Sequence, residues 1–148
     1  MKNTEIKKRF QRLLRSKYAE YLSVFFTGAV IYFTIELLWR GYSHLTMFCA
    51  GGMCFAGIYA FEKRIGSFRL LFRCLIYAGL ITTVEFVFGL VFNIALGMKI
   101  WDYSQTPFNF LGQICPQFYL AWILVSLPAV LLAGVIRRFF EKKREQLA

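Results

Sequence analysis

The chain has 148 residues, of which 58% are hydrophobic and 19% aromatic, and its formal net charge at pH 7 is +10. Roughly half apolar is the usual share for a soluble domain, and this composition excludes disordered, collagen-like and disulfide-scaffold proteins. The basic residues stand in blocks between long apolar runs, which is not the pattern of a compact nucleic-acid-binding domain. The sequence therefore predicts an integral membrane protein that binds no nucleic acid.

Four apolar runs are long enough to span a bilayer, whose hydrocarbon core of about 30 Å takes about 20 helical residues. The runs are continuous, whereas the strands of a membrane barrel alternate polar and apolar residues. We therefore expect an all-α four-helix bundle that forms one transmembrane domain over residues 1–148. The expected segments are a basic segment at 1–20, spans at about 21–39, 45–61, 71–96 and 114–136, and a basic tail at 137–148.

The basic segment 1–20 carries Ile6, Phe10, Leu13 and Leu14 at helical spacing among its charged residues. This pattern predicts a short amphipathic helix that lies on the inner leaflet and contacts anionic lipids. A binding surface for a partner protein is the alternative interpretation. No small-residue cleavage site follows the first apolar run, so we expect that run to remain as a membrane anchor.

The 18 basic residues are distributed unevenly over the expected connections. All but Arg40 and Lys99 lie in or beside the N-terminal segment, the connection between the second and third spans, and the tail. Because connections on the cytoplasmic side carry the excess of basic residues, both termini and the middle connection are expected in the cytoplasm. The chain is therefore expected to cross the membrane four times.

The first span ends with an acidic and a basic residue, Glu36 and Arg40, four positions apart. A glutamate placed N-terminal to an arginine at this spacing favours an ion pair on the helix surface. A local salt bridge at the interface is one interpretation. In the other, both residues belong to a pathway wall, and Arg40 reaches Glu85 or Asp102.

The second span is rich in small residues, and Gly52 with Ala56 fits the small-xxx-small pattern. Such a face lets the backbone of another helix approach closely. The sequence therefore predicts close packing at this face, either within the chain or between two copies of it.

The third span contains Glu85 near its middle. A charged carboxylate without a partner costs roughly a few kcal/mol or more in a membrane, so it faces protein or water, or takes up a proton. Thr82 and Asn93 share its helix face with small residues, which makes a polar stripe. We interpret Glu85, Asn93 and Thr82, together with Glu36 and Arg40, as candidate pathway or substrate-binding residues. An anchor for hydrogen bonds between helices is the alternative.

The first and third spans resemble each other, which suggests an internal repeat. In an alignment without gaps, Ala29 matches Ala78, Thr34 matches Thr83, and Glu36 matches Glu85. A 2+2 parallel repeat, with two spans in each half, is one interpretation. Convergent membrane composition explains the same identities without a duplication.

The residue types that most enzyme sites need are scarce in this chain. It has one His and four Cys without C-x-x-C spacing, which disfavours a zinc site. It contains no phosphate-binding P-loop, so no ATP hydrolysis is expected from this chain. The prediction is a protein that is not an enzyme and holds no cofactor or metal.

The connection between the third and fourth spans is the most distinctive stretch. Asp102 can accept a hydrogen bond from the backbone two residues on and so form a turn, while Trp101 and Tyr103 hold that turn at the interface. Asn109 and Gly112 suit a tight re-entry into the fourth span. The candidate outer-loop residues are Trp101, Asp102, Tyr103, Ser104, Pro107, Asn109 and Gly112.

With Glu85 and Gly89 before it and Ile114 and Cys115 after it, this loop resembles the motif of a bacterial family of ABC transporter permeases. The likeness is specific over about 85–115, and the pattern of spans extends it to roughly 20–136. The resemblance implies a small, multi-pass protein of the bacterial cytoplasmic (inner) membrane that works in transport. It also implies that the seven outer-loop residues are the motif residues of the family.

The leading functional hypothesis is a membrane transport component, with Glu85 and Asn93 lining a pathway and Asp102 with Trp101 at its outer mouth. Because four spans form a narrow bundle, we expect a homo-oligomer or a partner membrane subunit, with a separate ATPase as one source of energy. The substrate is not indicated by any motif. The alternative is an accessory or scaffold protein of an envelope complex.

Overall fold

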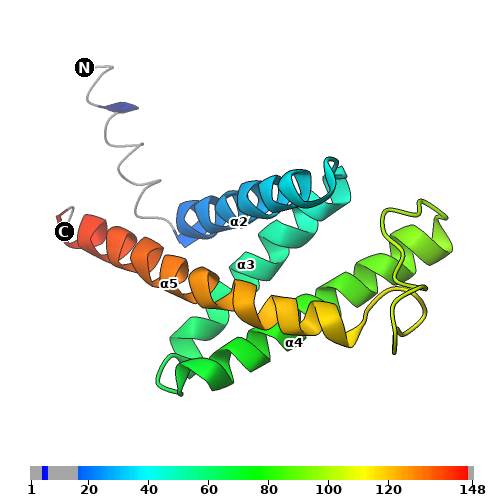
Figure 1. Ribbon diagram of the computed structural model, residues 1–148. Coiled ribbons are helices and arrows are strands. Elements are labelled where there is room, and N and C mark those ends of the chain that lie inside the picture. Colours follow the sequence, from blue (N-terminus) through cyan, green and yellow to red (C-terminus); the bar gives the residue numbers. More distant parts are fainter. Residues whose placement is uncertain (1–4, 7–16, 147–148) are drawn as a thin grey trace.

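The computed structural model describes residues 5–6 and 17–146. Four long helices make up most of this part of the chain (Figure 1), which contains one isolated bridge, Phe110 with Ile114, and no β-strand. The helices are α2 (Lys17–Arg40), α3 (Leu45–Ile65), α4 (Leu70–Phe88) with its continuation η1 (Gly89–Ala95), and α5 (Pro116–Gln146). The amphipathic helix predicted for residues 1–20 lies largely outside the described residues and stays a prediction.

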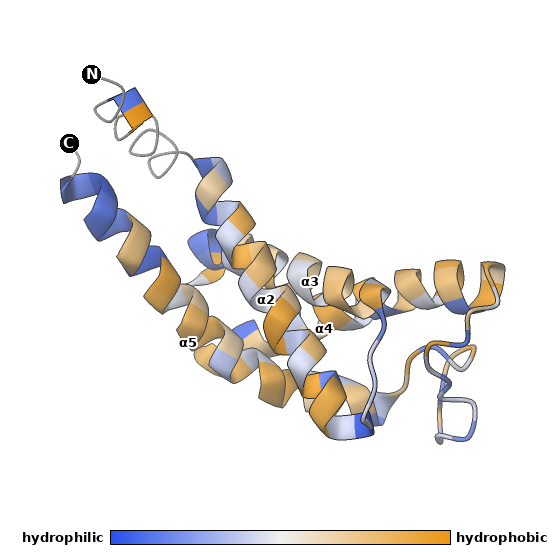
Figure 2. Ribbon diagram, turned by 90° about the horizontal axis from the view of Figure 1, so that it is seen from above, coloured by the Kyte–Doolittle hydropathy of each residue, from blue (hydrophilic) through white to orange (hydrophobic). Residues whose placement is uncertain are grey.

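Each of these helices is long and apolar enough to cross a membrane, with η1 counted as the end of α4. The predicted all-α membrane protein with four spanning helices is therefore confirmed. The first turn of α2 and the last turns of α5 lie at the same end of the molecule, where hydrophilic residues gather (Figure 2). The assignment of this end to the cytoplasm rests on the basic residues and stays a prediction.

The helices pair in chain order. α2 packs mainly along α3 and α4 mainly along α5, while α3 also contacts α4 and α5. α2 contacts α5 over a short stretch only, and the helices cross one another at marked angles (Figure 1). This pairing in twos does not by itself test the 2+2 parallel repeat, which stays a prediction.

Glycines bring α2 and α3 close together. A side chain at Gly28 would collide with Phe55 and come within 2.8 Å of the carbonyl oxygen of Gly51, and one at Gly52 would lie 2.6 Å from the ring of Phe25. The close packing predicted for the small residues of the second span is confirmed at Gly52. The sequence left open whether the glycines of this span pack within the chain or against a second copy. The helix that approaches them, α2, belongs to the same chain.

The outward faces of the helices are apolar. Leu38, Leu124 and Leu131 are examples of large hydrophobic side chains that are mostly exposed. A surface of this extent would be unfavourable in water, whereas lipid tails are as apolar as leucine and cover it readily. Figure 2 shows hydrophobic residues along most of the length of the helices, and hydrophilic residues at the first turn of α2 and the last turns of α5. Lipid therefore surrounds the middle of the bundle.

Two groups of buried residues hold the bundle at the level of the site. The central group joins α3, α4 and α5 and consists of Ile58, Tyr77, Ala78, Ile81, Trp122 and Val130. The second group lies where the loop between η1 and α5 meets α3, and it consists of Met47, Ile100 and Trp101. The loop is thus packed onto the bundle by its own apolar residues rather than left free.

Candidate functional site

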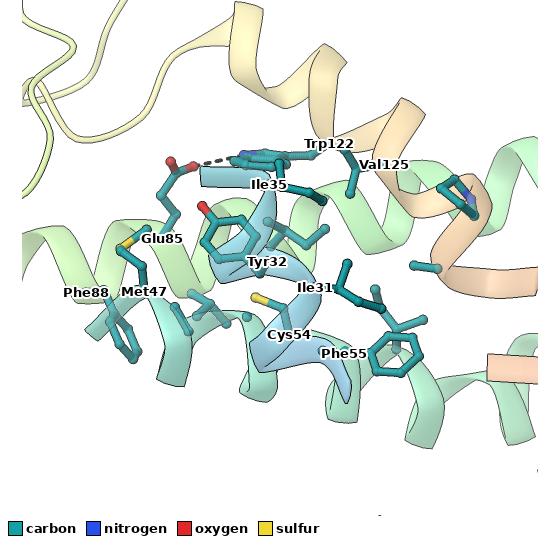
Figure 3. Close-up of a pocket in the computed structure, with 18 of the residues that line it drawn as sticks. Ile31, Tyr32, Ile35, Met47, Cys54, Phe55, Glu85, Phe88, Trp122 and Val125 are labelled. Carbon is teal, nitrogen blue, oxygen red and sulfur yellow. Dashed lines mark hydrogen bonds between the residues drawn. The ribbon is translucent and has the colours of Figure 1, made fainter. Parts of the chain in front are cut away.

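A cavity of about 170 Å³ lies where the four helices cross. Each helix contributes to its wall, and Trp101 from the loop between η1 and α5 is also part of it. Most of the wall is apolar, and Glu85 is the one acidic residue among the described residues that line it. Figure 3 shows Glu85, Tyr32 and Trp122 at one end of the cavity and Phe55 toward the other. A carboxylate thus borders a largely apolar space.

Both carboxylate oxygens of Glu85 accept a hydrogen bond from a neutral donor. The hydroxyl of Tyr103 donates to Oε1 at 2.8 Å, and the indole Nε1 of Trp122 donates to Oε2 at 2.9 Å. The residue is only 6% exposed. In the part of the chain that the structure describes, no Lys, Arg or His lies within 4.0 Å of this carboxylate. Glu85 is therefore a buried acid with hydrogen bonds but without a counter-ion.

The other largely buried glutamates of the described chain differ from Glu85 in this respect, since each has a basic partner. The closest pairs are Glu20 with Arg144 at 2.6 Å, Glu36 with Arg40 at 2.7 Å, and Glu62 with Arg73 at 2.6 Å. Glu20 also accepts a hydrogen bond from the hydroxyl of Tyr59, and Glu62 accepts one from the hydroxyl of Tyr77 at 2.5 Å. The pairs of Glu20 and Glu62 link two helices each, and the pair of Glu36 lies within α2, whereas Glu85 faces the cavity.

Asn93 ties the loop to the end of the third span. Its Nδ2 donates to the carbonyl oxygen of Trp101 at 3.0 Å and to Oε1 of Gln113 at 2.8 Å, and its Oδ1 accepts from the backbone N–H of Ile100 at 2.7 Å. The side chain thus joins both arms of the loop. It is not part of the cavity wall.

The third span changes from α-helix to π-helix at Gly89. A Cβ atom at position 89 would lie 2.5 Å from Oε1 of Gln113. The absence of a side chain at Gly89 therefore makes space for the amide of Gln113. Segments of π-helix are wider than α-helix and occur often at functional sites. In this chain the π-helix carries Asn93 and faces the loop.

The first half of the loop is a turn fixed by Trp101 and Asp102. The indole of Trp101 is buried and donates to the carbonyl oxygen of Gln113 at 3.0 Å. Oδ1 of Asp102 accepts from the backbone N–H of Ser104 at 2.8 Å, which confirms the predicted turn and lowers the pKa of this carboxyl. The backbone N–H of Tyr103 donates to the carbonyl oxygen of Gly112 at 2.8 Å, which joins the two halves of the loop.

Tyr103 is the loop residue that reaches the carboxylate at the cavity. Its ring stacks on Phe118 of α5 with centroids 4.5 Å apart, and its hydroxyl points to Glu85. Burial, followed by the charge of Glu85, raises the pKa of Tyr103 far above its ordinary value. The hydroxyl therefore stays protonated and serves as a neutral donor.

The second half of the loop is folded by Asn109 and Gly112. Nδ2 of Asn109 donates to the carbonyl oxygens of Thr106 at 2.8 Å and Ser104 at 3.1 Å, and Oδ1 accepts from the N–H of Gly112 at 2.9 Å. Gly112 has a φ of +68°, and a side chain there would lie 3.1 Å from Oδ1 of Asp102. Ser104 and Pro107 are exposed on this turn. Most motif residues thus build the loop, and Tyr103 also extends from it to Glu85.

The remaining candidates lie outside the cavity wall. Arg40 pairs with Glu36, as the spacing predicts, and its Nη1 also donates to the carbonyl oxygen of Ile100 at 2.9 Å. The pair therefore fastens the end of α2 to the loop, and Arg40 forms no ion pair with Glu85 or Asp102. Thr82 has a buried hydroxyl oxygen without a hydrogen-bond partner in the described chain.

Sequence reasoning missed two residues that shape the site, Gln113 and Trp122. Gln113 is buried and bonds Asn93, but it is not one of the seven motif residues of the loop, so the motif gave no reason to select it. Trp122 is the second donor to Glu85. A tryptophan well inside an apolar run, away from the interface where its N–H usually finds a partner, was the available signal.

Comparison with known protein families gave a match that covers most of the chain. A family model described as "Putative ABC-transporter type IV" matches residues 23–147. The match runs from within α2 to the end of α5 and includes the outer loop, and it confirms the family resemblance, although it does not test the roles of the motif residues. No curated protein and no solved structure matches the chain.

Proposed function

The chain belongs to the family described as ABC-transporter type IV, and from that premise we propose that it is the membrane component that contacts the transported molecule. The observation that carries this proposal is Glu85, a buried carboxylate that has no basic partner among the described residues and lies at the wall of the cavity between the four helices. An ionisable residue inside a membrane protein is expensive and marks a functional site more often than in a soluble protein.

The candidate residues take different roles in this proposal. Glu85 contacts the substrate, because it is the candidate acid at the cavity wall. Tyr103 and Trp101 position the loop side of the cavity, and Asn93 fixes that loop. The ion pair of Glu36 and Arg40 holds the loop from α2. Thr82 lies outside the cavity wall, so the proposal gives it no contact with the substrate.

Energy and partners come from outside this chain in our proposal. The sequence has no P-loop, so a separate ATPase supplies ATP hydrolysis. A cavity of about 170 Å³ is small for a transport pathway, which favours a homo-oligomer or a partner membrane subunit that widens the route. The basic ends contact anionic lipids of the inner leaflet of the bacterial cytoplasmic membrane.

A scaffold protein remains the second candidate function, and it was motivated by the small-residue face of the second span. Gly51 and Gly52 of that face are packed against Tyr32 and Phe25 of the same chain, so they are not free to bind another protein. This packing weakens the support for a scaffold.

Purification of the full chain from its native membranes in mild detergent tests the proposal. We expect an ATPase subunit in fixed stoichiometry, identified by mass spectrometry, and ATP hydrolysis by the purified complex. A complex with a different enzyme, or a homo-oligomer without ATP hydrolysis, would contradict a role as an ABC-transporter component. The first of these results would support a scaffold.

A further inference from the structure

We infer that the cavity binds an apolar molecule with one positive charge, and that this charge lies against Glu85. The inference rests on the proposed function, because it names the class of substrate that the transporter component contacts. It is carried by the charge of the cavity wall, by its aromatic rings and by the apolar remainder of the space.

The acid of the site has no basic partner among the described residues. The other largely buried glutamates of the described chain pair with Arg, whereas Glu85 receives only the neutral donors Tyr103 and Trp122. A carboxylate offers about four acceptor positions, and the two hydrogen bonds leave room for further contacts. A cation in the cavity would supply the missing counter-charge, and the low dielectric of the surroundings would strengthen that attraction.

Aromatic rings surround the same end of the cavity. Tyr32 and Trp122 lie beside Glu85 (Figure 3), and their ring centroids are 6.0 Å apart. Phe88 and Trp101 also belong to the wall. The faces of such rings attract a cation within about 6 Å of the centroid. This arrangement suits an ammonium group without hydrogen-bond donors better than a strongly hydrated ion.

The rest of the wall selects the body of the ligand. Residues such as Ile31, Ile35 and Leu132 offer only carbon atoms, so a sugar or a peptide backbone would lose hydrogen bonds there without replacement. A divalent metal ion is also disfavoured, because the described residues contain no group of three His, Cys, Asp or Glu side chains that could hold one. An apolar organic monocation satisfies both the acid and the apolar wall.

A structural role for Glu85 predicts a different response to substitution. If the carboxylate served only to hold Tyr103 and Trp122, Glu85→Gln would keep much of its function. The amide oxygen can accept from the indole, and the amide nitrogen can donate to the tyrosine hydroxyl. The glutamine has lost the charge, however, and therefore cannot attract a cation. Charge and hydrogen bonding can thus be separated at this position.

The experiment measures binding of benzyltrimethylammonium to the full chain in nanodiscs of zwitterionic lipid, by calorimetry and by tryptophan fluorescence. The neutral isostere neopentylbenzene has the same shape without the charge. We expect the wild type to bind the cation at least about tenfold more tightly than the isostere. Glu85→Gln should weaken cation binding at least about tenfold and leave isostere binding within about twofold. Glu141→Gln, an exposed acid on α5, should change neither.

Equal affinity of the wild type for both probes, absence of binding of the cation, or full cation binding by the Glu85→Gln variant would overturn the inference. The comparison of the two probes on the wild type needs no variant, so it decides even if Glu85→Gln fails to fold. If the wild type shows no preference for the cation but purifies with an ATPase subunit, the inferred ligand class is wrong and the proposed function still stands. If the chain binds the cation but has no ATPase partner, the ligand class is supported and the proposed role as an ABC-transporter component is contradicted.

Discussion

At the scale of single residues, two hydrogen bonds stabilise Glu85 in place of an ion pair. One donor, Tyr103, comes from the loop, and the other, Trp122, comes from α5. A hydrogen bond to an ionised group contributes about 1.5–3 kcal/mol, which is more than a bond between neutral groups contributes. The carboxylate therefore depends on a loop that lies far from it in sequence.

Substitution of Tyr103 tests this dependence. Tyr103→Phe removes the hydroxyl that bonds Glu85 and keeps the ring that stacks on Phe118. We expect the free energy of unfolding to fall by roughly 1–3 kcal/mol, because a buried carboxylate loses one of its donors. SDS titration followed by circular dichroism measures the change. Tyr42→Phe is the control, since Tyr42 is 60% exposed, and it should change stability by less than about 0.5 kcal/mol. Equal effects of both substitutions would contradict the bond.

A glycine of the loop provides a second test at this scale. Gly112 has a φ of +68° and lies close to Asp102, so Gly112→Ala should destabilise the protein by more than about 1 kcal/mol. Gly79→Ala is the matched control, because position 79 lies inside α4 with open space around it. The control should be neutral or stabilise by about 0.5–1 kcal/mol. Thermal unfolding of both variants measures the difference, and a stable Gly112→Ala variant would rule out the turn.

At the scale of the elements, the helices could be predicted and the contacts between them mostly could not. Each apolar run is a local signal, and its length alone predicts a spanning helix. The third span ends as the π-helix η1, and Gln113 of the loop packs on Gly89 where the π-helix begins. No local pattern contains that contact. The sequence therefore indicated where helices are but not how the third one ends.

The same distinction applies to the site. Glu85 could be selected from sequence because a buried acid in a membrane is costly wherever it lies. The place of Trp122 well inside the fourth apolar run was a signal, but its pairing with Glu85 could not be predicted, because the pairing depends on how α4 and α5 cross. Asn93 shares the stripe of Glu85 and was interpreted as pathway lining. In the structure its side chain forms hydrogen bonds with the backbone of the loop, because the π-helix and the loop meet there.

The close approach of α2 and α3 gives a prediction at this scale. Gly28→Leu should destabilise the protein by roughly 1–3 kcal/mol or more, because its side chain would collide with Phe55 and approach the backbone at Gly51. Gly134→Leu on α5 adds the same side chain at a position with open space and should be tolerated. Unfolding in SDS compares the two variants. If both unfold at the same SDS fraction, the glycine contact does not determine the packing of α2 on α3.

At the scale of the whole molecule, the chain is a splayed bundle with an apolar belt, a cavity at its crossing point and two polar ends. Buried acid–base pairs join the helices at one end. At the other, the loop between η1 and α5 is fixed to α2 and η1 by hydrogen bonds from Arg40 and Asn93. The cavity lies between these ends, so both can influence the shape of its wall.

The orientation of the bundle can be tested with cysteines placed on connections at opposite ends. In a chain whose four native cysteines are replaced by alanine, a membrane-impermeant maleimide on intact cells should label Ser104→Cys and spare Ser67→Cys. Inside-out vesicles should give the opposite pattern. The expectation follows from the excess of basic residues beside Ser67. Labelling of Ser67→Cys on intact cells would reverse the predicted topology.

The central claim is that Glu85 meets a bound molecule as well as its two donors, and infrared difference spectroscopy tests it most directly. Spectra of the full chain in nanodiscs are recorded with and without benzyltrimethylammonium. We predict a shift of one carboxyl or carboxylate band on addition of the cation, and the loss of this band shift in Glu85→Gln. Identical spectra with and without the cation, or the same shift in both proteins, would show that the cation does not reach Glu85.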